Sequence, residues 1–200
     1  MIRNLIFDVG GVLIGYRWKE MLVEDLGFEE AVADEVGALV FGTTYWANEF
    51  DRGTITFEEL LERLGIDFPH RREEITKMLM HPSLMNVDRP KVWEAIQKLK
   101  NQGYRIYLLS NYSKILFDIH TRDMTIHDIL DGRVISYEIN YIKPEPEIYQ
   151  SLLKKYNLIA EECLFFDDRE VNLAAAKEQG FETVLVENEN GLLEKLYELQ

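Results

Sequence analysis

Short apolar segments alternate with longer amphipathic ones over most of the chain, and this pattern is typical of a parallel α/β sheet. Leu5 to Phe7 is apolar without interruption, as expected for a strand that is buried on both faces. The expected strands are Asn4–Asp8, Tyr104–Ser110, Arg133–Ser136, Cys163–Phe166 and Thr183–Val186. We therefore predict a Rossmann-like α/β core.

Helices are predicted between these strands from their start and stop signals. They run from Asp88 and Pro90 to about Gln102, from Pro144 to about Asn157, and from about Val171 to Gln179. Each helix follows a strand, as right-handed crossovers require. The alternation therefore predicts a parallel sheet that is covered by helices.

Residues from about Gly15 to Asn86 interrupt this alternation, because they contain helical patterns and no convincing strand. The expected helices are Trp18–Leu26, Glu29–Phe41, Thr56–Leu64 and Arg71–Met80, and Thr56 to Glu59 has the spacing of a capping box. We predict a core formed by residues 1–14 and 87–200 and a small all-helical cap, residues 15–86, inserted after the first strand. Such a cap would lie over the carboxyl end of that strand as a lid.

The composition excludes several classes of partner. The 200 residues carry a formal charge of −14, which disfavours nucleic acids and anionic membrane surfaces. Cys163 is the single cysteine, so an internal disulfide is excluded, and no Cys/His cluster has zinc-ligand spacing. No apolar run reaches the length of a membrane span, and the expected location is the cytoplasm. No pattern indicates an oligomeric state.

Polar side chains suited to one reaction lie at the predicted strand ends. Asp8 follows the first strand, Ser110 and Asn111 follow the second, Lys143 precedes Pro144, and Asp167 and Asp168 close a buried strand. Adjacent buried carboxylates are costly unless a cation neutralises them, and Mg²⁺ is the expected cation. Each signal has an ordinary alternative: a solvated Asp, a turn Ser, a surface Lys or a helix-capping Asp pair. Their occurrence together, in order, favours a shared site.

The chain resembles the haloacid dehalogenase-like hydrolases over essentially its whole length. The resemblance rests on the ordered motifs Phe7-Asp8-Val9-Gly10-Gly11-Val12-Leu13, Leu109-Ser110-Asn111, Lys143-Pro144 and Phe166-Asp167-Asp168. It implies a Rossmann-like core whose first strand is central, with a helical cap inserted just after that strand. The form of the first motif is similar to the branch that contains sugar-phosphate phosphatases such as α-glucose-1-phosphatase.

This resemblance implies a role for each motif residue. Asp8 would attack phosphorus to give an aspartyl-phosphate that water then hydrolyses. The implied magnesium ligands are Asp8, the carbonyl of Gly10, Asp168 and, more weakly, Asp167, and the implied phosphate-binding residues are Ser110, Asn111, Lys143 and Gly11. Asn172 falls where some relatives place a further acid. The substrate class is a small phosphorylated metabolite, including sugar phosphates.

Gly10 departs from the pattern of most phosphatases in the superfamily, which carry an aspartate two residues after the nucleophile as general acid and base. Loss of such a group typically costs about 10²–10⁴ in rate unless another group replaces it. Anomeric sugar phosphates have a comparatively good leaving group, which fits the similarity of the first motif to the branch that contains sugar-phosphate phosphatases.

Two alternatives remain open from the sequence. A 2-haloacid dehalogenase also lacks the second acid, and the spacing from Lys143-Pro144 to Tyr149 is similar to that class, although paired carboxylates argue against it. A regulatory protein could bind Mg²⁺ and phosphate with little turnover. Within the cap, Trp46–Gly53 is expected to close over the site. Arg17 and Arg52 are expected to form surface ion pairs more than substrate contacts, and Tyr45, Trp46 and Phe50 to serve packing.

Overall fold

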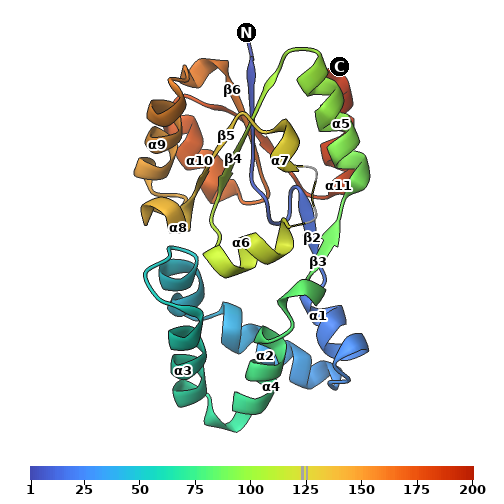
Figure 1. Cartoon of the computed structure of the whole chain (residues 1–200), viewed down its shortest axis with the longest axis vertical. Coiled ribbons are helices and arrows are strands. Elements are labelled where there is room, and N and C mark those ends of the chain that lie inside the picture. Colours follow the sequence, from blue (N-terminus) through green and yellow to red (C-terminus); the bar gives the residue numbers. More distant parts are fainter. Residues whose placement is uncertain (123, 125) are drawn as a thin grey trace.

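The computed structural model describes residues 1–122, 124 and 126–200, with the side chains of residues 126 and 127 excepted. Its main sheet contains five strands in the order β5-β4-β1-β6-β7, and every pairing is parallel (Figure 1). The strands are β1 (Asn4–Phe7), β4 (Arg105–Ser110), β5 (Gly132–Ile135), β6 (Cys163–Asp167) and β7 (Glu182–Leu185). Each predicted strand is present, displaced by no more than one residue at either end, and the predicted fold class is confirmed.

Strand β1 lies in the centre of the sheet, between β4 and β6. After β1 the chain builds β4 and β5 on one side, then crosses back to build β6 and β7 on the other. This reversal creates a crevice at the carboxyl end of β1, the position where parallel α/β sheets bind ligands. Asp8 directly follows β1 and therefore lies in that crevice.

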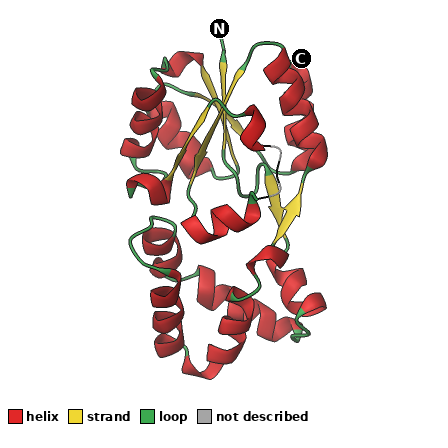
Figure 2. Ribbon diagram, viewed as in Figure 1, coloured by secondary structure: helices red, strands yellow, loops and turns green. Residues whose placement is uncertain are grey.

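The core of the sheet has two apolar layers, because successive side chains of a strand point to opposite faces. Leu5 and Phe7 belong to the layer under α5 (Pro90–Asn101) and α11 (Glu189–Glu198), whereas Ile6 belongs to the layer on the other side. That second layer contains side chains of α9 (Pro146–Tyr156) and α10 (Glu170–Glu178). These two helices lie on the opposite side of the sheet from α5 and α11 (Figure 2). The uninterrupted apolar run of β1 is explained by burial on both faces.

The start of one core helix differs from the prediction, and the cap helix expected to end at Leu64 continues to Asp67. Helix α9 begins at Pro146, so the expectation that Pro144 opens it was wrong. Glu145 precedes a proline and adopts an extended conformation with ψ of 134°, in line with the bias of such residues against helix. Its N–H instead donates to the carbonyl of Ile142 at 2.8 Å, which closes a turn. Lys143 therefore lies on this turn, ahead of the helix.

The shorter core helices are α6 (Lys114–His120), α7 (Ile126–Ile129), α8 (Ser136–Ile139) and a 3-10 turn at Ala160–Glu162. The cap contains α1 (Trp18–Glu20), which continues as a π-helical turn over Met21–Asp25, then α2 (Glu30–Phe41), a second π-helical turn at Tyr45–Phe50, α3 (Phe57–Asp67), a 3-10 turn at Pro69–Arg71, α4 (Arg72–Leu79) and a 3-10 turn at Pro82–Leu84. The capping box is present, since Thr56 N–H donates to Glu59 at 2.7 Å and Glu59 N–H donates back to Thr56 at 3.2 Å.

A two-stranded ribbon carries the chain between core and cap. Strand β2 (Ile14–Tyr16) pairs antiparallel with β3 (Asn86–Asp88), placing Tyr16 opposite Asn86. The expectation that residues 15 to 86 contain no strand was therefore wrong at both ends of that segment. Three-residue strands are too short to show an alternation of apolar and polar residues. They form because the segment that enters the cap and the segment that returns to the core lie side by side. The ribbon fixes Tyr16 beside the carboxyl edge of the main sheet.

No helix in the described part of the chain has both the length and the apolar character needed to cross a membrane.

Candidate active site

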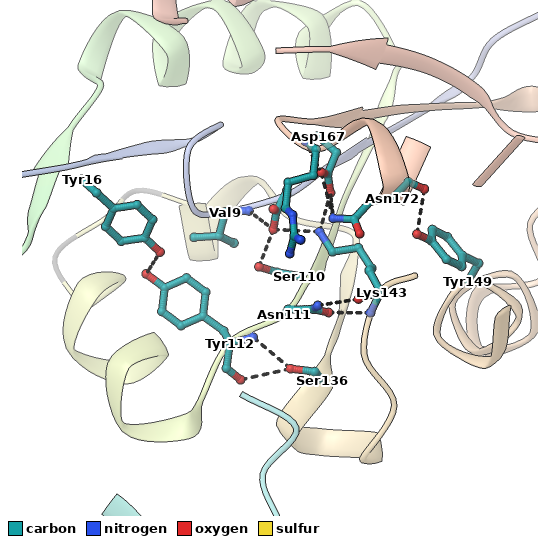
Figure 3. Close-up of polar contacts among 12 residues, drawn as sticks. Val9, Tyr16, Ser110, Asn111, Tyr112, Ser136, Lys143, Tyr149, Asp167 and Asn172 are labelled. Carbon is teal, nitrogen blue, oxygen red and sulfur yellow. Dashed lines mark hydrogen bonds and ion pairs between the residues drawn. The ribbon is translucent and has the colours of Figure 1, made fainter. Parts of the chain in front are cut away.

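Asp8 is positioned by the end of β1 and is only 8% exposed. One of its oxygens, Oδ1, accepts hydrogen bonds from the hydroxyl of Ser110 at 2.6 Å and from the N–H of Val9 at 2.7 Å (Figure 3). Ser110 is the last residue of the neighbouring strand β4, so the two side chains meet because parallel strands end at the same edge. These donors orient the Asp8 carboxylate toward the crevice.

Lys143 is the cation closest to Asp8, with Nζ 3.1 Å from its Oδ1. The same Nζ lies 2.6 Å from Oδ2 of Asp167, and the lysine is 2% exposed. Burial alone would lower the pKa of Lys143, but the charges of Asp167 and Asp8 outweigh it and raise that pKa above its usual value. Lys143 therefore carries a fixed positive charge between two carboxylates.

The adjacent aspartates at the end of β6 have different surroundings. Asp167 is fully buried and accepts from Lys143, from the Arg169 N–H at 2.8 Å, and from the Asn172 amide at 3.0 and 3.1 Å. Asp168 is exposed and lines the cavity in front of Asp8. Asn172 therefore helps to hold the Asp167 carboxylate in place, whereas the oxygens of Asp168 are more accessible.

Three carboxylates converge at this edge. Asp8, Asp167 and Asp168 can each offer an oxygen within 4.8 Å of the other two. Burial raises the pKa of Asp8 to about 7, with Asp167 and Asp168 adding to the rise and Lys143 and Ser110 opposing it. Partial burial and Asp167 likewise raise the pKa of Asp168. Such crowding of acidic oxygens suits a hard divalent cation, which would offset their mutual repulsion.

Gly11 leaves room for the Asp168 side chain to lie close to the loop after β1. It has φ of +74°, and a Cβ at this position would lie 2.9 Å from Cγ of Asp168. The carbonyls of Gly11 and Val12 accept from one guanidinium nitrogen of Arg89 at 2.8 and 2.7 Å. Arg89 follows strand β3 and holds the loop after β1 in place; it belongs to no motif, so no sequence pattern indicated this role.

Asn111 links two of the motif loops. Its side-chain oxygen accepts from the Lys143 N–H at 2.7 Å, and its amide nitrogen donates to the Lys143 carbonyl at 2.9 Å. This reciprocal pair fixes the backbone that carries the lysine. Asn111 also lines the cavity.

A cavity of about 360 Å³ extends from Asp8 to the cap. Its cap-side wall contains rings of Trp18, Phe41 and Trp46, which pack edge to face at centroid distances of 5.4 and 4.9 Å. Gly37 leaves the room that the Trp18 ring occupies. The lining residues contributed by the cap and the ribbon are Tyr16, Trp18, Phe41, Trp46, Ala47, Asp51 and Met85, and this described set includes no Lys or Arg.

The aromatic residues expected to serve packing have three different positions. Phe50 is buried at 3% exposure, as expected. Tyr45 donates its hydroxyl to Asp67 at 2.9 Å, outside the cavity. Trp46 packs against Phe41 and Phe50 and also faces the cavity, so it serves both purposes.

The loop after this aromatic segment contacts the core. Arg52 forms a two-pronged ion pair with Glu145, at 2.9 and 2.7 Å, and donates to the Asn140 carbonyl at 3.0 Å. Asp51 accepts from the Ser113 N–H at 3.1 Å and borders the cavity. Arg17 pairs with Asp25 at 2.5 Å and with Glu24 at 3.3 Å, away from the cavity. Both arginines form ion pairs, as the sequence analysis favoured, and those of Arg52 connect cap to core.

Comparisons with known proteins agree with this geometry. The family model described as haloacid dehalogenase-like hydrolase matches residues 2–180. The chain is 30% identical to D-ribitol-5-phosphate phosphatase from Bacteroides thetaiotaomicron over 196 residues, covering 94% of this chain and 93% of the relative. Among solved structures, a HAD family enzyme of the same organism, in complex with magnesium and inorganic phosphate, is 25% identical with a TM-score of 0.71, over 92% of this chain and 94% of that one. A dehalogenase structure, 21% identical with a TM-score of 0.76 over 100% and 97% of the two chains, shares the fold.

Proposed function

Since the chain belongs to the haloacid dehalogenase-like hydrolases, with phosphatases among its relatives, we propose that it is a magnesium-dependent phosphatase that hydrolyses a small phosphorylated metabolite through an aspartyl-phosphate on Asp8. The observation that carries this proposal is the convergence of Ser110, Lys143 and three aspartates around one crevice. A carboxylate nucleophile, a fixed cation and a cluster of acidic oxygens are the parts that phosphoryl transfer requires.

In the first step, the free oxygen of Asp8 attacks phosphorus while Oδ1 remains held by Ser110 and Val9. The P–O bond to the leaving group breaks, and the leaving oxygen takes the electron pair. Lys143 stays beside Asp8 and takes up charge that develops on the phosphoryl oxygens. Water then attacks phosphorus and the bond from phosphorus to Asp8 breaks, so the products of this step are the Asp8 carboxylate, inorganic phosphate and one proton.

Mg²⁺ fits the acidic residues at this edge of the sheet. We assign Asp8, Asp168 and the Gly10 carbonyl as its ligands, and Asp167 as the weaker one, because the oxygens of Asp167 already accept from Lys143, Arg169 and Asn172. A bound Mg²⁺ would offset the repulsion between the anionic nucleophile and an anionic substrate. Ser110, Asn111, Lys143 and the backbone of Gly11 would hold the phosphoryl group.

The cavity favours a leaving group without a second negative charge. Its cations, Lys143 and Arg169, come from the core, and its cap-side wall consists of apolar side chains, Tyr16 and Asp51. A sugar or polyol monophosphate meets these conditions, and the relative named for D-ribitol 5-phosphate gives that class further support. A pyrophosphate or a bisphosphate would carry a second anion toward a cap-side lining that, among the described residues, offers no Lys or Arg to pair with it.

The test is a panel of phosphate monoesters assayed for phosphate release with and without Mg²⁺, beside Asp8→Asn. Wild-type protein is expected to release phosphate only with Mg²⁺, and Asp8→Asn to lose at least about 10⁴ of the rate. Asp118→Asn, an exposed carboxylate paired with Lys114, is the matched control. Full activity in Asp8→Asn would refute the nucleophile, and halide release from a 2-haloacid without metal would favour dehalogenation instead.

A further inference from the structure

The space above Gly10 is filled by the Tyr16 side chain. A Cβ built on Gly10 would lie 2.9 Å from Tyr16 Cζ and 2.8 Å from its Cε2, and it would overlap the phenolic oxygen. Gly10 is two residues from Asp8, and both line the same cavity as Tyr16. Hence the hydroxyl of Tyr16 occupies the place that a side chain at position 10 would otherwise take.

Tyr16 is the first member of a hydrogen-bonded chain that leads into the protein. Its hydroxyl is 2.9 Å from that of Tyr112, and the Tyr112 hydroxyl is 2.7 Å from Nδ1 of His120. Figure 3 shows the side chains of Tyr16 and Tyr112 pointing toward each other. Nε2 of His120 is 2.8 Å from the carbonyl of Pro82. Tyr112 and His120 are buried, whereas Tyr16 is half exposed toward the cavity.

The Pro82 carbonyl determines which group donates in each hydrogen bond between Tyr16, Tyr112 and His120. A carbonyl oxygen can only accept, so Nε2 of His120 carries a hydrogen and, in the neutral ring, Nδ1 is the acceptor. Tyr112 must then donate to Nδ1, and Tyr16 must donate to Tyr112. The oxygen of Tyr16 consequently presents lone pairs to the cavity, where it can accept a hydrogen bond from water.

The surroundings of His120 favour its neutral form at rest. Burial lowers the pKa of its imidazole, and the hydrogen bond to the Pro82 carbonyl opposes that effect only in part. Among the described residues, the titratable groups that face this hydrogen-bonded chain are Tyr16 and Tyr112 themselves. The charges of Asp8 and Asp51 act on both phenols, and that of Asp168 acts on Tyr16. Burial, chiefly, raises the pKa of the Tyr112 phenol, so Tyr112 stays protonated and passes a proton without ionising.

We propose that Tyr16 accepts the proton of the water that hydrolyses the aspartyl-phosphate, and that Tyr112 and His120 receive it in turn, replacing the carboxylate absent at Gly10. A bond forms between the water oxygen and phosphorus, and the bond from phosphorus to Asp8 breaks with its electron pair going to the carboxylate. The water proton moves to Tyr16, the Tyr16 proton to Tyr112, and the Tyr112 proton to Nδ1 of His120. The products are inorganic phosphate, Asp8 carboxylate and a His120 imidazolium, which then loses its proton to solvent.

This inference rests on the proposed function, because it requires an aspartyl-phosphate to hydrolyse. The proton relay makes Tyr16 a catalytic residue that touches the water, and it makes Tyr112 and His120 positioning residues that act through Tyr16. The relay acts only in the hydrolysis of the aspartyl-phosphate. Its loss therefore leaves the formation of the aspartyl-phosphate unaffected when the leaving group needs no proton. The two steps can therefore be measured separately.

The experiment follows p-nitrophenyl phosphate hydrolysis with Mg²⁺ by rapid mixing, because p-nitrophenolate leaves without a proton. The variants are Tyr16→Phe, which keeps the ring and removes the hydroxyl, and His120→Asn, whose amide can accept from Tyr112 but cannot hold the proton. Both are expected to keep the initial burst of p-nitrophenol and to slow the later steady rate about 10²-fold, the low end of the range for a general base. Acid-quenched samples should then contain more phosphorylated protein than wild type.

The pH profile gives a second readout. In wild-type protein the steady rate should fall as pH drops through the pKa of His120, because an imidazolium cannot accept the proton. With Mg²⁺ kept saturating at every pH, so that weaker metal binding at low pH does not lower the rate, this decline should disappear in His120→Asn. Tyr197→Phe and His81→Gln, which remove an exposed phenol and an exposed imidazole, should behave as wild type in both assays.

A rescue variant separates the relay from a structural effect. Tyr16→Ala combined with Gly10→Asp opens the space and fills it with a carboxylate on a backbone that needs no positive φ. This double variant should exceed Tyr16→Ala in steady rate by at least tenfold and lose its sensitivity to His120→Asn. If Tyr16→Phe hydrolyses its phosphoenzyme at the wild-type rate, the relay is overturned while the phosphatase stands. If wild type forms no phosphoenzyme, the proposed function itself has failed.

Discussion

The two walls of the active-site cavity are built on different principles. On the core side, polar groups from neighbouring strand ends hold one another: Lys143 contacts Asp8 and Asp167, and Ser110 donates to Asp8. On the cap side, Trp18, Phe41 and Trp46 present ring faces and edges with few hydrogen-bonding atoms. The core side resists change because removing one partner leaves a buried charge unpaired. Changes to these three rings alter shape and apolar area only, so selectivity can vary there while the chemistry is retained.

Replacement of Lys143 should give the largest effect on the core side. In Lys143→Met two buried carboxylates lose their cation, which costs about 3–5 kcal/mol in free energy of unfolding, and the rate should fall at least about 10²–10³-fold. Urea denaturation and phosphate release measure the two effects. Adding Asp167→Asn should restore part of the stability and none of the activity. An unchanged stability in Lys143→Met, relative to the exposed control Lys154→Met, would contradict the charge pairing described here.

The adjacent aspartates should differ in metal binding. Asp168→Asn should weaken Mg²⁺ binding more than about 100-fold, whereas Asp167→Asn should weaken it about tenfold, the smaller range typical of residues that only orient ligands. Titration calorimetry with the metal alone measures both. Equal losses would show that Asp167 binds the ion directly, despite its hydrogen bonds to Lys143 and Asn172.

Magnesium binding should depend on pH with a defined sign. In the metal-free protein the pKa of Asp8 is raised to about 7, so below that pH the carboxyl holds a proton that a cation must displace. Affinity should therefore rise as pH increases to about 7, by roughly tenfold per pH unit below it, and then level off. Calorimetry in buffers of different ionisation enthalpy should detect proton release on binding at pH 6 and little at pH 8.5. Proton uptake, or no pH dependence, would contradict the raised pKa.

On the cap side, Trp46→Ala should reduce kcat/KM for the preferred monophosphate by about tenfold, the range that lost apolar contact produces in specificity pockets. The rate on p-nitrophenyl phosphate relative to other small esters should change as well, since the cavity becomes wider. Ile66→Ala, an exposed apolar position of the cap, is the control. If Trp46→Ala lowered activity on every ester by the same factor as Lys143→Met, this would contradict the assignment of chemistry to the core side and selectivity to the cap side.

The smallest effect is expected at the contact between cap and core. Arg52→Ala removes the two-pronged pair with Glu145, and because Arg52 is partly exposed, the loss should raise KM by only a few-fold. Added salt should raise KM in wild type toward the Arg52→Ala value. Arg63→Ala, whose partner Glu49 lies within the cap, should leave KM unchanged.

The strand ends of the core could be predicted because their signals are local. An apolar run that stops at Asp8, at Ser110 or at Asp167 indicates both the strand and the side chain at its carboxyl edge. Parallel pairing then brings these positions together with little further information. Helix starts were less certain, as Pro144 shows, because two prolines close together offer two possible first positions.

Tyr16 and Arg89 could not be predicted in the same way. Tyr16 reaches Gly10 only because the short ribbon of β2 and β3 exists, and that ribbon depends on a pairing between residues 14–16 and 86–88. Arg89 reaches the Gly11 carbonyl across 78 positions of sequence. No periodicity or motif encodes contacts of this length, since each is set by packing between segments that the sequence separates.

The sequence by itself determined the α/β core, the insertion of helices after the first strand and the order of the acidic, hydroxyl and lysine residues at the strand ends. These follow from side-chain period, burial and the geometry of parallel strands, which are properties of short segments. Only the tertiary structure decided which aspartate is enclosed by donors, which rings face the cavity, and what occupies the space beside Gly10. Those outcomes depend on how the cap, the ribbon and the core pack together, and the physical reason is that burial and hydrogen-bond direction are set by all neighbours at once.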